Sequence, residues 1–391
     1  MKLLRSFNFK ELLRPIGQMI MFSLGTSIVL SLIIVVSALF LDNTVVGAET
    51  LEKYKMSLFN FALFNLPQVI LDGLTIGFVY AAIALGYTMV YGVLEFINFA
   101  HSEIFATGAF VGVELLIYLK EAGKLADIST ATAYLILSGA VLAGMIGAGF
   151  MAWLVERVAY RPLRGSKSRL VPLISAIGVS FLLQDTIRLT ESLTTGEFHR
   201  IFPTFGNFSN RINLGQIDLG TNQIMLGVSI KSIIVIVAAV AMLVALNYLV
   251  NATRVGKAIR AVAQDRTTAA LMGINVNAII SLTFIVGGVL GGAAGVLFAL
   301  KFTRIDPFVG FFPGMKAFTA AVMGGIGNLT GALLGGIVLG MLETFAGAYM
   351  GVFTMGAAGS EYKDIFAFGI LILVLIFRPQ GLMGENVTQK A

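Results

Sequence analysis

The chain contains no cysteine and only two histidines, His101 and His199. Without cysteine it forms neither disulfides nor thiolate metal sites, and a cysteine nucleophile is excluded. Two histidines offer little for a histidine-rich metal centre. A phosphate-binding loop of the form G-x-x-x-x-G-K-[ST] is also missing from the sequence, so the chain lacks this motif for hydrolysing ATP by itself. These absences argue against an enzyme.

Charged residues are scarce, at 12% of the chain, whereas hydrophobic residues make up 57% of its 391 residues. A soluble domain usually carries about 25% charged residues, and one or two cores cannot hide this much apolar surface from water. The composition therefore excludes a soluble enzyme, a nucleic-acid-binding domain and a disordered chain. A mean hydropathy of +0.89 indicates a polytopic membrane protein.

Apolar runs recur along the chain, and a crossing helix needs roughly 20 mostly apolar residues. The runs cover residues 19–41, 69–93, 95–119, 132–155, 170–188, 228–250 and 274–300, with a final segment at 363–378. The stretch 315–350 is also apolar but is interrupted by glycines. We predict an all-α polytopic membrane protein with about eight membrane crossings plus a glycine-rich re-entrant or broken helix. The first run is too long for a signal peptide, so we expect an extra N-terminal span.

Basic residues cluster in three of the loops between these runs. Residues 1–18, 155–169 and 251–273 hold 13 of the 27 lysines and arginines, and basic loops tend to stay in the cytoplasm. We therefore expect both termini in the cytoplasm. Because both termini then lie on the same side of the membrane, the number of crossings is even and residues 315–350 make no net crossing. We therefore expect this stretch to be re-entrant or to form two short half-crossings. Because non-helical backbone inside a membrane occurs only against protein or a water-filled cavity, the stretch is a candidate substrate path.

A polar stretch interrupts the apolar pattern between residues 94 and 110. It carries Glu95, Asn98, His101 and Glu103 beside or within an apolar span. Placing an ionisable group at the bilayer centre costs about 3 kcal/mol on insertion scales, and such groups usually face a bundle interior or a cavity. Glu95, Asn98 and Ser102 share one helix face. The alternative is a turn at the cytoplasmic interface that caps two helix ends. It explains Glu95 easily, but His101 and Glu103 less well.

The segment 254–273 predicts a pair of short helices between two spans. The first has apolar residues at helical spacing on one face and basic residues such as Arg260 on the other. Asp265 can cap a second helix over Arg266–Met272, which Gly273 can end. Such a pair either lies on a lipid surface or inserts into a groove on a soluble partner. Charge alone favours the lipid surface.

A third stretch, residues 320–336, is rich in glycine. Gly325 and Gly327 favour an unwound backbone, and Asn328 can cap a returning half-helix. A half-helix N-terminus directed at a cavity attracts a carboxylate. A tightly packed re-entrant hairpin without a ligand is the alternative interpretation.

Several motifs resemble those of the branched-chain amino acid ABC transporter permeases. They are Gly73-Leu-Thr-Ile-Gly, Ala84-Leu-Gly-Tyr-Thr-Met-Val-Tyr-Gly, Ile97-Asn-Phe-Ala-His-Ser-Glu, Gly256-Lys-Ala-Ile-Arg-Ala-Val-Ala-Gln-Asp-Arg, Ala270-Leu-Met-Gly-Ile-Asn, Gly314-Met-Lys-Ala-Phe-Thr-Ala-Ala-Val-Met-Gly-Gly-Ile-Gly and Arg378-Pro-Gln-Gly-Leu. Their order and spacing agree from about residue 66 to 382, and the chain looks closer to the LivH-type than to the LivM-type subunit. Ser102 departs from the pattern, because the family usually has glycine there.

The resemblance implies a permease subunit of a bacterial-type inner membrane. It implies a second homologous permease, two cytoplasmic ATP-binding subunits that hydrolyse ATP, and a periplasmic substrate-binding protein as partners. It implies contact with membrane lipid, no nucleic acid and no cofactor in this chain. Residues 1–65 would be an extra N-terminal span and linker, 66–382 the permease domain, and 383–391 a short cytoplasmic tail.

Candidate functional residues follow from the three stretches. The substrate-path candidates are Asn98, His101, Glu103, Gly325, Gly327 and Asn328. The resemblance makes 251–273 the loop that docks on the ATPase, in place of the lipid surface. The candidates for coupling to the ATPase are Arg260, Asp265, Arg266, Ala269, Ala270 and Gly273. We expect both arginines to reach acidic groups on the ATPase, and both alanines to pack in its groove.

The leading hypothesis is a permease subunit of an ATP-driven importer for branched-chain or related amino acids. The alternative is a stand-alone secondary transporter or channel for a small polar solute. That alternative predicts an intramembrane acid–base pair for ion coupling, such as Glu103 with His101. The residues leave open whether the substrate is a branched-chain amino acid, another amino acid, urea or a short amide, and whether the permease pair is homo- or heterodimeric.

Overall fold

The computed structural model describes residues 9–94, 96–164, 168, 170–218 and 223–384. The expectations for Glu95, for the N-terminal residues 1–8 and for most of the C-terminal tail lie outside these ranges. Within them the chain is mainly helical, with two small antiparallel strand pairs.

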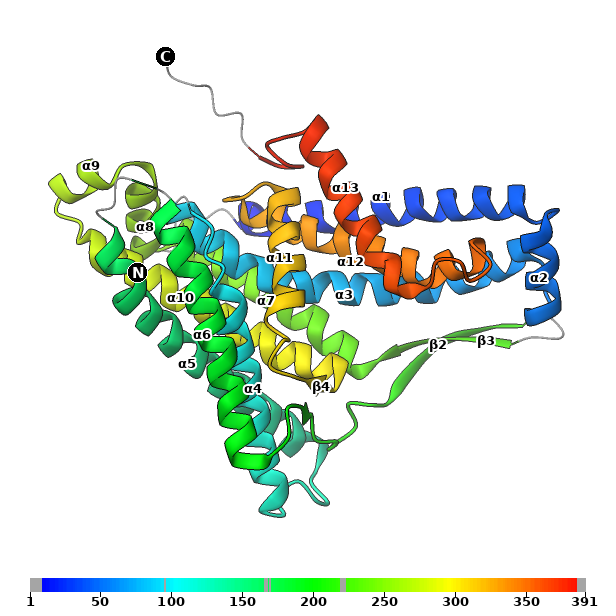
Figure 1. Ribbon diagram of the computed structural model, residues 1–391, viewed down its shortest axis with the longest axis horizontal. Coiled ribbons are helices and arrows are strands. Elements are labelled where there is room, and N and C mark those ends of the chain that lie inside the picture. Colours follow the sequence, from blue (N-terminus) through cyan, green and yellow to red (C-terminus); the bar gives the residue numbers. More distant parts are fainter. Residues whose placement is uncertain (1–8, 95, 165–167, 169, 219–222, 385–391) are drawn as a thin grey trace.

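Eight helices in the described ranges are long and apolar enough to cross a membrane. They are α1 (Phe9–Leu41), α3 (Leu58–Leu94), α4 (His101–Glu121), α5 (Thr130–Val155), α6 (Leu170–Thr195), α7 (Ile230–Ala252), α10 (Val276–Phe302) and α12 (Leu329–Phe353). The prediction of an all-α polytopic membrane protein with about eight crossings is therefore confirmed. In Figure 1, α1, α3 and α12 lie side by side, and α4, α5 and α6 form a second group inclined to the first.

The stretch 315–350 is broken as predicted, because residues 325–328 separate α11 (Phe311–Gly324) from α12. The prediction of two short half-crossings is wrong for α12, whose 25 residues are long enough to cross about 30 Å of hydrocarbon alone. By contrast α13 (Lys363–Phe377), expected as a crossing, has only 15 residues and rises about 22 Å. α12 is therefore one of the eight candidate crossings, and α13 is shorter than any of them. The segment after α13 returns to the turn at residues 325–328, where the Leu382 and Met383 backbone N–H groups donate to the carbonyls of Met323 and Gly324.

Shorter elements occupy the connections. The helices α2 (Val45–Tyr54), α8 (Arg254–Gln264) and α9 (Arg266–Leu271) join longer ones. Strand β1 (Arg200–Ile201) pairs with β4 (Arg304–Ile305), and β2 (Arg211–Asp218) pairs with β3 (Gln223–Ser229). The sequence did not predict the β2–β3 hairpin, which extends beside α3 toward α2 (Figure 1).

The centre of the molecule is α10, which packs against α3, α4 and α5. Its close approach to α4 and α5 depends on three glycines, Gly108, Gly144 and Gly292. A methyl group on Gly108 would overlap Gly292, and one on Gly292 would overlap the carbonyl of Gly144. Small residues that let helix backbones meet are typical of membrane helix packing. The contact between these three glycines fixes the position of α4 against α5 and α10. It therefore also fixes the position of the polar stretch around residue 100, which directly precedes α4.

Candidate functional site

The polar stretch forms the break between two long helices. α3 ends at Leu94 and α4 begins at His101, so the predicted turn that joins two helix ends is present. Asn98, His101 and Glu103 are all buried, at 3%, 1% and 0% exposed. Buried polar groups need partners, and the three side chains find different surroundings.

Asn98 points toward the end of α5. Its Oδ1 accepts a hydrogen bond of 2.6 Å from the hydroxyl of Tyr160, which lies in the π-helical turn Glu156–Tyr160 that follows α5. The Tyr160 ring is held between Phe96 and Phe284, at centroid distances of 5.5 and 5.4 Å. Asn98 Nδ2 has no hydrogen-bond partner in the described ranges.

His101 fills a slot between α3 and α10. Its ring packs edge-on against Tyr87 at 4.7 Å and faces Gly86 and Gly291, where an added methyl group would contact the ring. Such packing is that of a core residue. Glu103 lies two residues further along α4, on another face. Its carboxyl group touches Gly310 at the start of α11. Within the part of the chain that the structure describes, no hydrogen bond joins His101 Nε2 to the Glu103 carboxyl group, so the pair expected for an ion-coupled transporter is not formed.

Glu103 is buried without compensation. Neither carboxyl oxygen has a hydrogen-bond partner among the residues that the structure describes, although burial of a charge normally requires one. The adjacent Ser102 donates its hydroxyl to the Phe99 carbonyl and packs against Gly314 of α11. Because Gly314 lacks a Cβ, α11 leaves room for the Ser102 side chain.

The glycine-rich turn between α11 and α12 has the unwound backbone predicted for it. Gly325 and Gly327 adopt φ of +105° and +93°, which glycine tolerates best. Asn328 Oδ1 accepts from the Gly331 backbone N–H at 2.9 Å, which confirms its capping role. Asn328 Nδ2 donates to the Met383 carbonyl at 2.9 Å. The turn is therefore attached to the C-terminal segment.

One small cavity lies between the polar stretch and the glycine-rich turn. It is lined by Tyr87, Thr88, Tyr91, Ile97, Asn98, Phe318, Ala321 and Ile326, and measures about 10 Å³. Asn98 belongs to the polar stretch between α3 and α4, and Ile326 to the glycine-rich turn between α11 and α12. Space of this size accommodates about one water molecule, so this conformation is closed to an amino acid. His101, Glu103, Gly325, Gly327 and Asn328 are not part of the cavity wall.

A second polar cluster was missed by the sequence analysis. Glu343 on α12 is 3% exposed and accepts hydrogen bonds from Tyr80 at 2.7 Å, Lys316 at 2.9 Å and Lys363 at 2.9 Å. Lys316 also pairs with Asp364 at 2.8 Å. These charges bind α11 and α13 to α12 and α3. Lysine and glutamate within apolar runs are the signal that predicts such a cluster.

The segment 254–273 folds into the predicted helix pair, α8 and α9. Asp265 caps α9 and accepts from the backbone N–H groups of Thr267 and Thr268, at 2.8 and 3.1 Å. The Thr268 hydroxyl and these two N–H groups lower the pKa of Asp265, because each bond favours the charged carboxylate. Gly273 follows with φ of +81°, so α9 ends as predicted.

The coupling candidates divide into attached and exposed residues. Arg266 donates to the carbonyls of Val93 and Leu94 at the end of α3, at 3.0 and 3.2 Å, and Arg260 donates to the Val250 carbonyl. Both arginines thus have partners within the chain. Ala269 is buried, whereas Ala270 is exposed.

Two further exposed residues follow Ala270. Leu271 and Met272 are 83% and 78% exposed, and sequence reasoning did not single them out. Large apolar residues left in solvent at a helix end mark a contact surface when they adjoin one another.

A larger cavity of about 280 Å³ separates α8 and α9 from the end of α3. Phe96, Tyr160, Arg164 and Arg266 contribute to its wall. Tyr160 thus reaches from this cavity to Asn98. Burial lowers the pKa of the Arg164 guanidinium, and its ion pair with Glu156 opposes that shift.

The eight long apolar helices define a multi-pass membrane protein. Residues 69–375 match the family model described as the branched-chain amino acid transport system permease component. The chain belongs to this family. The match begins within α3, so it does not include α1 and α2.

Individual relatives agree with the family match. The chain is 40% identical to the high-affinity branched-chain amino acid transport system permease protein LivH of Salmonella typhimurium, over 83% of this chain and 97% of that protein. It is 39% identical to the corresponding BraD protein of Pseudomonas aeruginosa, over 84% and 99%. A more distant similarity, 28% over 33% of this chain and 40% of the relative, links it to the ribose import permease protein RbsC of Escherichia coli.

Proposed function

We propose that this chain is the permease subunit of an ATP-driven importer for branched-chain or related amino acids. It works with a second homologous permease, two cytoplasmic ATP-binding subunits and a soluble substrate-binding protein. The family match and the names of the relatives support the transport role. The missing phosphate-binding loop requires ATP to be hydrolysed by partner subunits. The chain itself is not an enzyme and needs no cofactor of its own.

The exposed end of α9 is the single observation that carries this proposal. Ala270, Leu271 and Met272 form an apolar knob on a short capped helix, and an apolar helix end of this kind fits a groove on a soluble partner. Arg266 attaches the same helix to α3, and four residues join it to α10. A partner that moves α9 therefore moves both α3 and α10.

The substrate path is inferred to pass between the polar break and the glycine turn. The cavity shared by Asn98 and Ile326 marks its closed centre, and α11 covers the unpaired carboxyl of Glu103. Displacement of α11 opens this cavity and uncovers the Glu103 carboxyl group. His101, Gly325, Gly327 and Asn328 position the walls of the path rather than line it.

The orientation follows from charge and from lipid exposure. The basic loops favour a cytoplasmic position for α8, α9 and both termini, in an inner membrane. α1 faces membrane lipid, since few residues of its apolar window are buried and Ile28, Leu32 and Phe40 are exposed.

Uptake assays distinguish this importer from a transporter that works alone. Cells that express the complete system are compared with cells whose ATP-binding subunits carry an inactivated phosphate-binding loop. We expect leucine uptake to be lost in the second strain and to persist when an uncoupler collapses the ion gradient while ATP is maintained. Uptake that survives loss of the ATPase but stops with the gradient would contradict the proposal.

A further inference from the structure

A third cavity, of about 500 Å³, lies between the end of α5 and the start of α10. The chain passes there from α5 into the π-helical turn Glu156–Tyr160, and π-helical turns attached to helices often mark functional sites. This cavity shares no residue with the small cavity at Asn98, so the proposed substrate path does not use it. We refer to it as the α5–α10 cavity.

Two arginines and the first turn of α10 supply positive charge to the α5–α10 cavity. Arg157 and Arg161 belong to its wall, as do Asn275 and Asn277 at the start of α10. The first N–H groups of a helix have no partner within it and carry the positive end of the helix dipole. Among the described residues, no aspartate or glutamate lines this cavity. Its charged lining is therefore entirely basic.

The buried carboxylate beside the cavity already has a partner. Glu156 directly precedes Arg157 and pairs with Arg164, which also donates to Asn277 Oδ1 at 2.7 Å. Arg157 and Arg161 form no ion pair within the ranges that the structure covers. Each guanidinium carries five N–H donors, so both side chains have donors to offer to an external anion.

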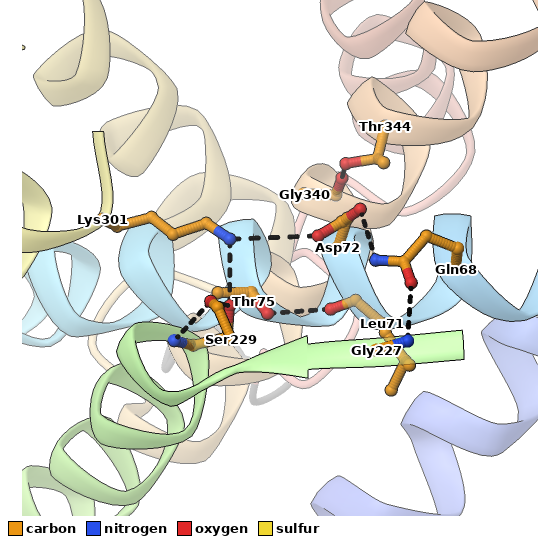
Figure 2. A network of polar contacts seen from close by, with 10 residues as sticks. Gln68, Leu71, Asp72, Thr75, Gly227, Ser229, Lys301, Gly340 and Thr344 are labelled. Carbon is orange, nitrogen blue, oxygen red and sulfur yellow. Dashed lines mark hydrogen bonds and ion pairs between the residues drawn. The ribbon is translucent and has the colours of Figure 1, made fainter. Parts of the chain in front are cut away.

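The basic residue at the opposite end of α10 differs, because it has acceptors within the chain. Lys301, in the last turn of α10, donates to Ser232 Oγ at 3.0 Å and lies 3.9 Å from Asp72 Oδ1 (Figure 2). Asp72 Oδ2 accepts in turn from Gln68 Nε2 at 2.9 Å. An external anion would compete with these acceptors for Lys301, whereas the two arginines of the α5–α10 cavity have no carboxylate to release.

Apolar side chains continue from the α5–α10 cavity along the outside of α5. Leu282 and Ile285 of α10 belong to the cavity wall. On α5, Leu142, Ile146 and Phe150 are 56%, 71% and 59% exposed, and residues four apart share one face of a helix. A contiguous exposed apolar face on a membrane-spanning helix indicates contact with lipid or with another membrane protein.

Trp153 joins the basic and the apolar parts of this region. It lines the cavity, and its ring centroid lies 5.8 Å from that of Phe150. The Arg157 guanidinium lies over the Trp153 ring, 5.8 Å from the centroid. Tryptophan is enriched where a membrane meets water, and arginine extends its charged end into the head-group layer from such positions. The cations thus lie at the level of the phosphates, beside a face suited to acyl chains.

We propose that the α5–α10 cavity binds an anionic phospholipid. Arg157 and Arg161 contact its phosphate, and its acyl chains lie against Leu282, Ile285 and the exposed face of α5. Basic cavities between membrane helices on the cytoplasmic side are typical sites for anionic head groups. A free phosphate ion would use the arginines but leave the apolar wall without a role.

The lipid site requires only that the chain spans a membrane, as its long apolar helices indicate. In the proposed orientation the lipid belongs to the cytoplasmic leaflet. Only four residues separate α9 from α10, so a lipid held between α5 and α10 steadies the helix to which α9 is attached.

The test uses the fluorescence of Trp153, because it is the one tryptophan in the sequence. The full-length chain is reconstituted in phosphatidylcholine vesicles that contain increasing fractions of phosphatidylglycerol brominated on its acyl chains, which quench a neighbouring indole. The fraction that gives half-maximal quenching is compared with that of brominated phosphatidylcholine. Each basic residue near an anionic surface contributes about a fivefold attraction. We therefore expect half-maximal quenching at an about 25-fold lower fraction of phosphatidylglycerol.

Two double variants of equal charge separate the cavity from the general charge of the protein. Arg157→Gln combined with Arg161→Gln should raise the half-quenching fraction of phosphatidylglycerol about 25-fold, and each single variant about fivefold. Arg254→Gln combined with Lys257→Gln removes two exposed cations from α8 and should leave that fraction unchanged. Fluorescence is normalised to unbrominated vesicles, and unchanged quenching by brominated phosphatidylcholine shows that each variant is still inserted.

A preference for phosphatidylglycerol that is lost in the cavity variant and kept in the α8 variant supports the lipid site. Equal half-quenching fractions of the two lipids in the wild type, or equal losses in the two double variants, overturn it. Inorganic phosphate that abolishes the preference, when sodium chloride of the same ionic strength does not, assigns the arginines to a free anion and overturns it. Absence of quenching by either lipid shows that Trp153 lies against protein, such as a second copy of the chain, and overturns it as well.

Discussion

Arg266 on α9 donates a hydrogen bond of 3.0 Å to the carbonyl of Val93, one residue before the end of α3. The last carbonyls of a helix lack partners within it, and an arginine placed there satisfies them and complements the helix dipole. The bond attaches α9 to the C-terminal end of α3. Any movement of α9 is therefore passed to the helix that carries Tyr87 and Thr88 at the closed cavity.

Arg266→Gln should loosen the attachment of α9 to α3 without removing the ATPase. A hydrogen bond to a charged group contributes about 1.5–3 kcal/mol to stability. The Arg266 guanidinium makes its hydrogen bonds to carbonyls within this chain. We expect the ATP-binding subunits to co-purify with this variant, while the ratio of leucine taken up to ATP hydrolysed falls. Loss of the ATP-binding subunits during purification would place Arg266 at the subunit contact instead.

Tryptophan substitutions should separate the two neighbouring alanines. Ala269 is 4% exposed, so Ala269→Trp overpacks the fold and should destabilise it by about 1–3 kcal/mol or more. Ala270 is exposed, so Ala270→Trp should leave the thermal midpoint of the isolated permease nearly unchanged and weaken co-purification of the ATPase. Intact co-purification and hydrolysis with Ala270→Trp would return this helix pair to the lipid surface.

Asp265 should make the stability of the α9 N-terminus depend on pH. Its pKa is lowered in the folded chain, from an unfolded value of about 3.9. Its contribution is therefore present above that value and is lost as the pH falls through the folded pKa. We expect Asp265→Ala to speed amide hydrogen exchange at Thr267 and Thr268 at neutral pH, relative to wild type, and the difference to vanish in acid.

The control for that prediction is Asp265→Asn. Asparagine is a good N-cap but does not titrate, so it should protect the same amides at neutral pH and keep its protection in acid. Equal exchange in wild type and Asp265→Ala at neutral pH would show that the cap does not hold α9.

Glu343 should be the most sensitive position for stability. It accepts hydrogen bonds from three helices, and removing one partner of a buried charge network costs about 3–5 kcal/mol. We expect Glu343→Ala to lower the thermal midpoint strongly, and Glu343→Leu combined with Lys316→Met to recover part of the loss. A double variant as unstable as the sum of the two single variants would rule out an energetic coupling between them.

Asn98 and Tyr160 allow the path to be tested separately from the fold. Tyr160→Phe removes their hydrogen bond but keeps the ring between its neighbours. If Asn98 lines the path, Asn98→Ala should reduce leucine uptake severalfold while Tyr160→Phe changes it little. Equal losses of uptake in the two variants would show that Asn98 acts only as the hydrogen-bond partner of Tyr160 and does not line the path.

Local signals made part of this structure predictable. The caps at Asp265 and Asn328, and the glycine ends at Gly273 and Gly325, depend on residues close in sequence, and all are present. The apolar runs predicted the crossings for the same reason. The apolar run at 363–378 forms a helix as well, but α13 has 15 residues, fewer than the roughly 20 that a crossing helix usually needs.

Long-range partners were not predictable. Glu343 pairs with Tyr80, 263 positions away, and nothing in either local sequence indicates the other. The direction of a side chain also depends on packing. His101 and Glu103 were grouped as path residues, yet one fills a slot beside Gly86 and the other meets Gly310. The partners of Arg266, the last carbonyls of α3, were not predictable either, because they are defined only once α3 and α9 meet.

The most direct test of the importer is leucine uptake into proteoliposomes that contain both permeases and the ATP-binding subunits, with the binding protein on the face opposite the ATPase. We predict uptake that requires ATP and the binding protein together, stops when the phosphate-binding loop of the ATPase is inactivated, and needs no ion gradient. Leucine uptake driven by a proton or sodium gradient in liposomes that contain this chain alone would contradict that prediction.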